Sequence, residues 1–247
     1  MILVLTYHKV MPEHAADQDF YTVTPETLEQ QLDAVLASGV RPLAPPELLQ
    51  PGTPSGFLLT FDDATSDHVE IVVPLLHRRK LTGTFFVPTA KLGQQGYLQE
   101  SDVIFLRKSG HEVGCHSHEH RRMDRMSQEE AQGQLKTSRD ILRRLTGAAP
   151  VYFAPPGGFT SATLIRSALG CGLKITRTMR WGLNAQVDLS QLECVPVNRH
   201  MGPREFEKAI RGQKPKLVYT AKEAIKRVVP AKAYEALRRA YFRFQKK

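Results

Sequence analysis

Short apolar runs alternate with helical patterns along the first 200 or so residues, and this alternation restricts the fold more than any other feature. The runs expected to form strands are residues 2–6, 57–61, 84–87, 112–115, 151–153, 174–178 and 193–197. The segments expected to form helices are residues 24–38, 68–80, 101–109, 127–146 and 161–169. Strands that alternate with helices form βαβ units and a parallel sheet. Seven such strands predict an α/β fold, an irregular (β/α) barrel, whose catalytic groups would lie at the carboxyl ends of the strands.

The basic charge of the chain is concentrated at its C-terminal end. The 247 residues carry 34 Lys and Arg and 25 Asp and Glu, a net charge of +9. Residues 1–202 hold 20 basic and 21 acidic side chains, whereas residues 203–247 hold 14 and 4. We therefore expect two parts, a globular domain over residues 1–202 and a basic helical tail over residues 203–247.

The tail has the pattern of an amphipathic helix after Pro230. Its apolar positions recur at helical spacing, at Tyr234, Leu237, Tyr241 and Phe244, with basic residues between them. Such a helix either docks on an anionic membrane surface or packs its aromatic residues onto the body. The tail carries no recognised nucleic-acid motif, so a nucleic-acid partner is not favoured.

Cysteine content and the N-terminal run favour a cytoplasmic protein. Three cysteines (Cys115, Cys171 and Cys194) are an odd, sparse set and imply no disulfide framework. The first residues lack the charged segment and cleavage site of a signal peptide, and no apolar run approaches the ~20 residues of a membrane span. A membrane-docking tail would place this cytoplasmic protein on the inner face of the membrane.

Two adjacent carboxylates close the second expected strand, in Thr60-Phe61-Asp62-Asp63. Burying a charge is costly without a partner. The pair is therefore either a solvated turn or helix cap, or a site in which one carboxylate binds a cation while its neighbour acts as a base.

A histidine cluster follows the strand expected at residues 112–115. Four of the nine histidines lie close together, at positions 111, 116, 118 and 120. In a helix, His116 and His120 would face one way and His118 would face away. Two imidazoles and a carboxylate from another strand end would give the three protein ligands of an open catalytic zinc site. The alternative is a polar loop that happens to be rich in histidine.

The strand expected at residues 151–153 runs into Ala154-Pro155-Pro156-Gly157-Gly158. Prolines followed by glycines fix a loop and leave backbone N–H groups accessible. This suits either an oxyanion-binding site or an ordinary turn.

These segments together resemble the polysaccharide deacetylase family, the divalent-metal sugar deacetylases of carbohydrate esterase family 4, including its nodulation-type chitooligosaccharide deacetylase domains. Residues 60–63 resemble the family's first motif, residues 116–120 its His-Ser/Thr-x-x-His motif, and residues 154–157 a variant of its third. Tyr7-His8 resembles the Tyr-His start of one branch. The resemblance covers roughly residues 1–200.

The resemblance implies a role for each matched residue. Asp62 would be the general base, Ser117 would brace the histidine loop, and the Gly157 amide, after Pro155, would help to bind the oxyanion. The metal ligands would be Asp63, His116 and His120. Zinc is the metal expected for two histidines and a carboxylate, and nickel or cobalt would also fit.

The chain departs from the family pattern at three places. Ala154 stands where an arginine often pairs with the base, so Asp62 is expected to be oriented by another group or to have a different pKa. Ala64 stands where glycine is common, and the late Leu-x-His acid motif is not clear near His200. The general acid is therefore either His8, which we prefer, or His200.

The resemblance implies a metal-dependent hydrolase that removes N-acetyl groups from an amino sugar in a glycan, an oligosaccharide or a lipid-linked intermediate. Trp181, the only tryptophan, either walls an acetyl pocket or packs in the core. The alternatives are a de-N-formylase or small-amide hydrolase of the same fold, or a non-catalytic sugar-binding relative.

Overall fold

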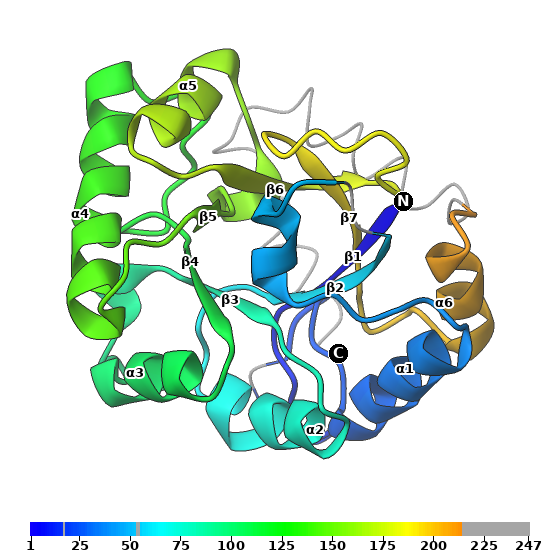
Figure 1. Cartoon of the computed structure of the whole chain (residues 1–247). Coiled ribbons are helices and arrows are strands. Elements are labelled where there is room, and N and C mark those ends of the chain that lie inside the picture. Colours follow the sequence, from blue (N-terminus) through cyan, green and yellow to red (C-terminus); the bar gives the residue numbers. More distant parts are fainter. Residues whose placement is uncertain (17, 53–54, 214–247) are drawn as a thin grey trace.

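Seven parallel strands close into a barrel in the order in which they occur along the chain (Figure 1), as a computed structural model of the protein shows. The structure describes residues 1–16, 18–52 and 55–213. The strands are β1 (Ile2–Tyr7), β2 (Gly56–Phe61), β3 (Thr84–Val87), β4 (Glu112–Cys115), β5 (Tyr152–Phe153), β6 (Ile175–Trp181) and β7 (Leu192–Pro196). Two residue pairs between β1 and β7 close the ring. The α/β barrel expected from the sequence is confirmed.

Six α-helices surround the ring of strands (Figure 1). They are α1 (Pro25–Ala37), α2 (Val73–Arg78), α3 (Glu100–Lys108), α4 (Gln128–Thr146), α5 (Ala162–Gly170) and α6 (Pro203–Ile210). Hydroxyl side chains begin three of them, because Thr24, Ser127 and Ser161 each accept a hydrogen bond from a backbone N–H of the first turn. Helix α4 ends at Gly147, which adopts the left-handed conformation that glycine tolerates best.

The single helix expected over residues 68–80 is two elements in the structure. Residues 68–72 form a π-helical turn, η2 (His68–Val72), and α2 begins only at Val73. The N–H of Val73 donates to the carbonyl of His68, and Pro74, which has no N–H, cannot continue the regular hydrogen-bond pattern.

The barrel interior is apolar at one end. A short helix, η1 (Pro45–Leu49), drawn in blue across the strands in Figure 1, closes this end. Its Leu48 packs with residues from five of the strands, and the Tyr152 hydroxyl donates to the Pro45 carbonyl. Phe86 fills the space beside Gly114, where a Cβ atom would lie 2.5 Å from the phenyl ring. A second apolar layer lies between the strands and the helices.

The interior becomes polar toward the carboxyl ends of β1 and β2. The hydroxyls of Thr6 and Thr60 lie 2.8 Å apart on these neighbouring strands. Two residues further along each strand come His8 and Asp62. Side chains two positions apart share a face of a strand, so both residues lie above the threonine pair. The open end of the barrel therefore carries the residues singled out from the sequence.

The described part of the basic tail packs against the body. Helix α6 lies beside α1 and buries Phe206, Ala209 and Ile210. The amphipathic helix expected after Pro230 lies outside the described residues, so membrane docking stays a prediction. None of the described helices is long and apolar enough to cross a membrane.

Candidate active site

The turn after β2 sends two carboxylates in different directions. Asp63 and Ala64 both adopt positive φ, 79° and 53°. This left-handed conformation is sparsely populated by residues other than glycine, and such strain is concentrated at functional sites. It also gives a reason why glycine is common at position 64 in the family that the chain resembles. As a result Asp63 faces the histidine loop, and Asp62 is buried among other partners.

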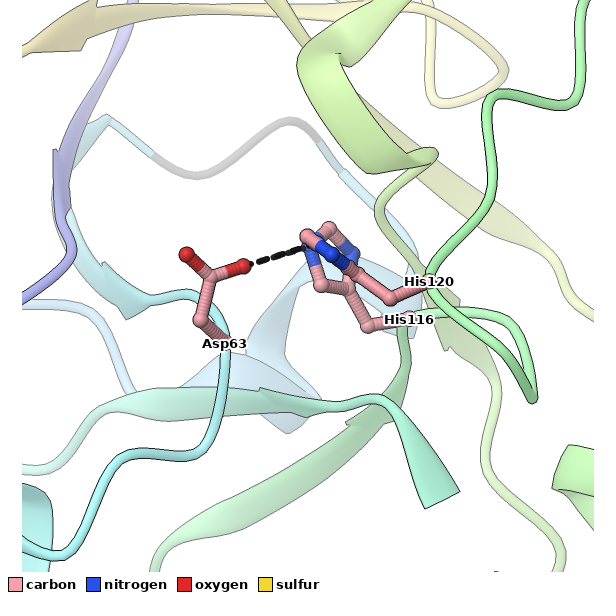
Figure 2. Close-up of side chains that lie close together, drawn as sticks. All are labelled: Asp63, His116 and His120. Carbon is pink, nitrogen blue, oxygen red and sulfur yellow. Dashed lines mark ion pairs between the residues drawn. The ribbon is translucent and has the colours of Figure 1, made fainter. Parts of the chain in front are cut away.

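Asp63, His116 and His120 converge at the open end of the barrel (Figure 2). The Oδ1 atom of Asp63 lies 2.9 Å from Nε2 of His120 and 3.3 Å from Nε2 of His116. The helical interpretation of the histidine segment is wrong, because residues 116–120 form a loop in which Ser117 and His120 have left-handed φ of 64° and 59°. The Ser117 hydroxyl accepts a hydrogen bond of 3.0 Å from the His120 N–H, and so braces the loop.

The surroundings of the histidines decide which ring nitrogens are free to bind a metal. Nδ1 of His116 donates to the Ala154 carbonyl at 2.5 Å, which leaves the Nε2 lone pair directed to Asp63. His118 turns away and hydrogen-bonds through Nδ1 to the Thr89 hydroxyl at 2.9 Å. His111 lies elsewhere, because its Nδ1 accepts from the N–H of Gly83, the residue before β3.

The donor set fits a divalent metal. One atom from each of Asp63, His116 and His120 lies within 4.8 Å of the other two. Burial would raise the pKa of Asp63, but its hydrogen bonds to both imidazoles outweigh burial and hold that pKa well below its usual range. Two imidazole nitrogens and an ionised carboxylate match the three protein ligands of a catalytic zinc site, and nickel or cobalt would also be accepted.

Asp62 is a buried carboxylate with a buried arginine as its partner. The guanidinium of Arg177, on β6, donates to both carboxylate oxygens and lies 5.2 Å from the centre of the Phe86 ring. Burial would raise the pKa of Asp62, but the charge of Arg177 outweighs burial and lowers it. Asp62 is therefore ionised at neutral pH. Arg177 fills the role of the arginine missing at position 154, and sequence analysis did not identify it, although an arginine inside a buried strand is itself a signal.

Of the two candidate acids, the structure brings His8 to Asp62. Nε2 of His8 lies 3.8 Å from Oδ2 of Asp62, and the His8 ring stacks on Tyr21 with centroids 4.5 Å apart. Burial lowers the pKa of His8, and the charge of Asp62 opposes this shift. His200 is exposed, and its ring lies 5.6 Å from Phe20, which packs edge-on against Tyr21. Two aromatic rings thus stand between His200 and His8.

The loop after β5 lies beside the histidine loop. Its Pro155 is buried and its Gly157 is exposed with φ of 71°. The Arg122 guanidinium, which follows the histidine segment, lies 3.7 Å from the centre of the Phe159 ring and so joins the two loops. Trp181, at the end of β6, packs against the apolar layer between strands and helices. An oxyanion role for Gly157 and an acetyl pocket at Trp181 stay predictions.

These groups are the parts of a hydrolytic site. An ionised carboxylate can accept a proton, a nearby imidazole can donate one, and the three-ligand site can hold a Lewis acid. All of them lie at the carboxyl ends of barrel strands, where (β/α) barrels place their catalytic residues.

Comparisons with known proteins agree with this arrangement. The polysaccharide deacetylase family model matches residues 50–176. The peptidoglycan-N-acetylmuramic acid deacetylase PdaC of Bacillus subtilis is 35% identical over 104 residues, 40% of this chain and 21% of that protein. The peptidoglycan-N-acetylglucosamine deacetylase PgdA of Listeria monocytogenes is 31% identical over 114 residues, 46% of this chain and 24% of that protein. The chain thus matches less than a quarter of the length of either relative.

A solved structure shares the fold. The deacetylase PplD of Streptococcus pyogenes, determined in complex with acetate, superposes with a TM-score of 0.74 at 23% sequence identity. The superposition covers 87% of this chain and 98% of that chain. The barrel described here is therefore the barrel of that deacetylase, with the same closed arrangement over nearly its whole length.

Proposed function

The chain belongs to the polysaccharide deacetylase family of carbohydrate deacetylases, and from this we propose that it is a metal-dependent hydrolase. Its substrate would be an N-acetylated amino sugar in a glycan, an oligosaccharide or a lipid-linked intermediate. One observation carries the proposal: an ionised, arginine-held carboxylate and an imidazole lie beside a ready set of three metal ligands.

Asp63, His116 and His120 would hold the metal. When bound, a divalent cation there polarises the acetyl carbonyl and lowers the pKa of a water molecule toward ~7. The hydrogen bond from His116 to the Ala154 carbonyl keeps that ring in the tautomer that a ligand needs.

Asp62 would act as the general base. Its carboxylate accepts one proton from the attacking water as the new carbon–oxygen bond forms. Arg177 keeps Asp62 ionised and fixes the direction of its lone pairs, because both carboxylate oxygens accept from the same guanidinium. The N–H of Gly157 would stabilise the oxyanion that develops on the former carbonyl oxygen.

His8 would act as the general acid. The carbon–nitrogen bond breaks as the leaving amine takes a proton from the imidazolium of His8, and the products are acetate and a free amino sugar. The carboxylates of Asp62 and Asp63 favour the charged imidazolium against the effect of burial. Proton acceptor and proton donor thus lie side by side, 3.8 Å apart.

The names of the relatives support the substrate class. The two curated relatives above are named for N-acetylmuramic acid and N-acetylglucosamine of peptidoglycan, both N-acetylated amino sugars. A cytoplasmic enzyme would meet such sugars in nucleotide-linked or lipid-linked form more readily than in finished wall polymer. A basic tail on an anionic membrane would favour the lipid-linked form.

Acetate release tests the proposal. Purified protein supplied with Zn²⁺, Co²⁺ or Ni²⁺ is expected to release acetate from N-acetylglucosamine oligosaccharides, and a chelator should abolish this. Asp62→Asn should lose ~10²–10⁴-fold in rate while it keeps its metal. Asp124→Asn, a carboxamide exchange in the loop after the histidines, is the matched control. A fully active Asp62→Asn protein, or chelator-resistant release, would refute the proposed chemistry, and formyl but not acetyl release would change the substrate.

A further inference from the structure

The backbone around His8 is held on both sides by two side chains from one short segment. Nε2 of His68 donates to the carbonyl oxygen of His8 at 2.7 Å. Oδ2 of Asp67 accepts from the N–H of Val10, also at 2.7 Å. His68 is fully buried and Asp67 is nearly so. We call these two hydrogen bonds the clamp.

The clamp begins directly after the carboxylate turn. Asp67 and His68 lie at the start of η2, which follows the turn that carries Asp62 and Asp63. The His68 ring is fixed by packing, with Phe61 at 5.8 Å and Phe85 at 5.6 Å between ring centroids. Because a carbonyl can only accept, Nε2 of His68 carries the proton. The segment that presents the base therefore also grips the strand end that presents His8.

His8 needs such support because its ring has little of its own. Among the described residues, Nδ1 of His8 is buried without a hydrogen-bond partner. A catalytic imidazole is often oriented by a hydrogen bond to this nitrogen. The ring instead stacks on Tyr21, an arrangement that restricts tilt but allows sliding in the plane. The position of Nε2 relative to Asp62 is therefore set mainly by the backbone of residues 8–10.

We propose that His68 and Asp67 are positioning residues for His8, and that the clamp sets the distance from the general acid to the leaving nitrogen. This inference rests on the proposed function, in which His8 protonates the leaving amine. A displacement of ~1 Å at a reacting group can cost ~10²-fold in rate, so loss of the clamp should approach the loss of the acid itself.

Leaving-group dependence separates this role from a structural one. An amine must be protonated to leave, whereas the phenolate of 4-nitrophenyl acetate leaves without a proton. His68→Phe keeps an aromatic ring against Phe61 and Phe85 but removes the donor. It should lower chelator-sensitive release of acetate from an N-acetylated chitooligosaccharide ~10–100-fold, and chelator-sensitive cleavage of the ester by less than ~3-fold. His68→Gln, which retains an N–H donor, should recover most of the lost rate.

His111→Phe is the matched control. His111 is also buried, and its ring packs edge-on against the same Phe85 at 5.2 Å, but its hydrogen bonds go to Gly83 and His77. It should leave the ratio of amide to ester rates unchanged. Asp67→Ala should repeat the amide-selective loss, and His68→Phe in a His8→Ala background should cost nothing more, because the two residues act through one proton transfer.

Equal loss on both substrates, or a further loss in the His8→Ala background, would overturn the positioning role. Amide hydrogen exchange at Val10 gives a second readout that does not depend on catalysis. We expect faster exchange at Val10 in His68→Phe and Asp67→Ala, and unchanged exchange in His111→Phe. Wild-type protein inactive on both substrates would refute the proposed function, while faster exchange would still establish the clamp. Unchanged exchange together with an unchanged rate ratio would overturn the clamp itself.

Discussion

Removing the guanidinium of Arg177 should destabilise the protein strongly, because it leaves Asp62 buried without its counter-charge. The side chains of Arg177 and Asp62 are only 2% and 3% exposed, so water cannot replace either partner. Arg177→Met is the cleanest perturbation, since methionine keeps a flexible apolar chain over Phe86 and deletes only the charge. It separates the ion pair from the packing around it.

The expected magnitude follows from the burial of both groups. Breaking a buried pair by removing one partner costs ~3–5 kcal/mol, because an uncompensated charge remains. For a chain of this size that corresponds to a fall in melting temperature of ~6–20 °C. Replacing both charges, in Arg177→Met with Asp62→Leu, should cost far less than the two single changes together, since apolar replacement of a buried pair is often neutral. The double-mutant cycle should therefore show a coupling of several kcal/mol.

Urea unfolding of the metal-free protein at pH 7 measures these free energies, with the fluorescence of Trp181, the only tryptophan, and far-ultraviolet circular dichroism as probes. A chelator in every sample prevents metal binding from changing the apparent stability. Arg180→Met is the matched control on the same strand. The Arg180 side chain is 42% exposed and 4.0 Å from Glu193, so its loss should cost less than ~1 kcal/mol.

Two results would refute the reasoning. One is a loss in Arg177→Met no larger than in Arg180→Met, and the other is simple additivity of the Arg177 and Asp62 changes. The pH dependence adds a check with a defined sign. Burial is no longer opposed in Arg177→Met, so the pKa of Asp62 should rise. The destabilisation should then shrink as the pH falls toward 4, because protonation of Asp62 removes the unpaired charge.

Three further predictions follow from the geometry. His120→Ala should lose bound metal by elemental analysis, whereas His118→Ala, whose ring faces away, should keep it. Gly114→Ala should cost ~1–3 kcal/mol in urea, because its Cβ would meet the aromatic ring that fills the barrel, while Gly133→Ala in open space on α4 should not destabilise. Burial lowers the pKa of His111 to about 4, so the unfolded chain binds its proton first. Stability should fall by at most ~3 kcal/mol from pH 6.5 to 4, and His111→Phe should remove this part. Metal lost in both histidine variants, equal glycine effects or an unchanged pH slope would contradict them.

The strands and most helices could be predicted because their signals are local. Each strand is a short apolar run that ends at polar or turn residues, and each helix start has a hydroxyl or proline signal. Closure of the barrel depends instead on the contact of β1 with β7, which the structure makes through only two residue pairs, Leu5 with Val195 and Thr6 with Pro196. No local pattern carries that information.

The histidine site was predicted with the right residues and the wrong backbone. Helical periodicity puts positions 116 and 120 on one face, and the structure does bring both rings to Asp63. It does so with left-handed residues at Ser117 and His120, and neither serine nor histidine announces that conformation in a sequence. The residue types fixed the chemistry, whereas the path of the loop depended on the Ser117 hydroxyl and on the Ala154 carbonyl.

The partner of Asp62 shows why the rest of the site was beyond a motif. The base needs a guanidinium beside it, but the chemistry does not specify which strand supplies one. Here it comes from Arg177, 115 residues away in sequence, in the place of the arginine absent at position 154. That position is usable only because Phe86 gives the guanidinium a surface to lie on and Gly114 leaves room for the phenyl ring. The orientation of the base is thus a property of three strands packed together, and it should be lost by repacking β3 or β4 even when every motif residue is kept.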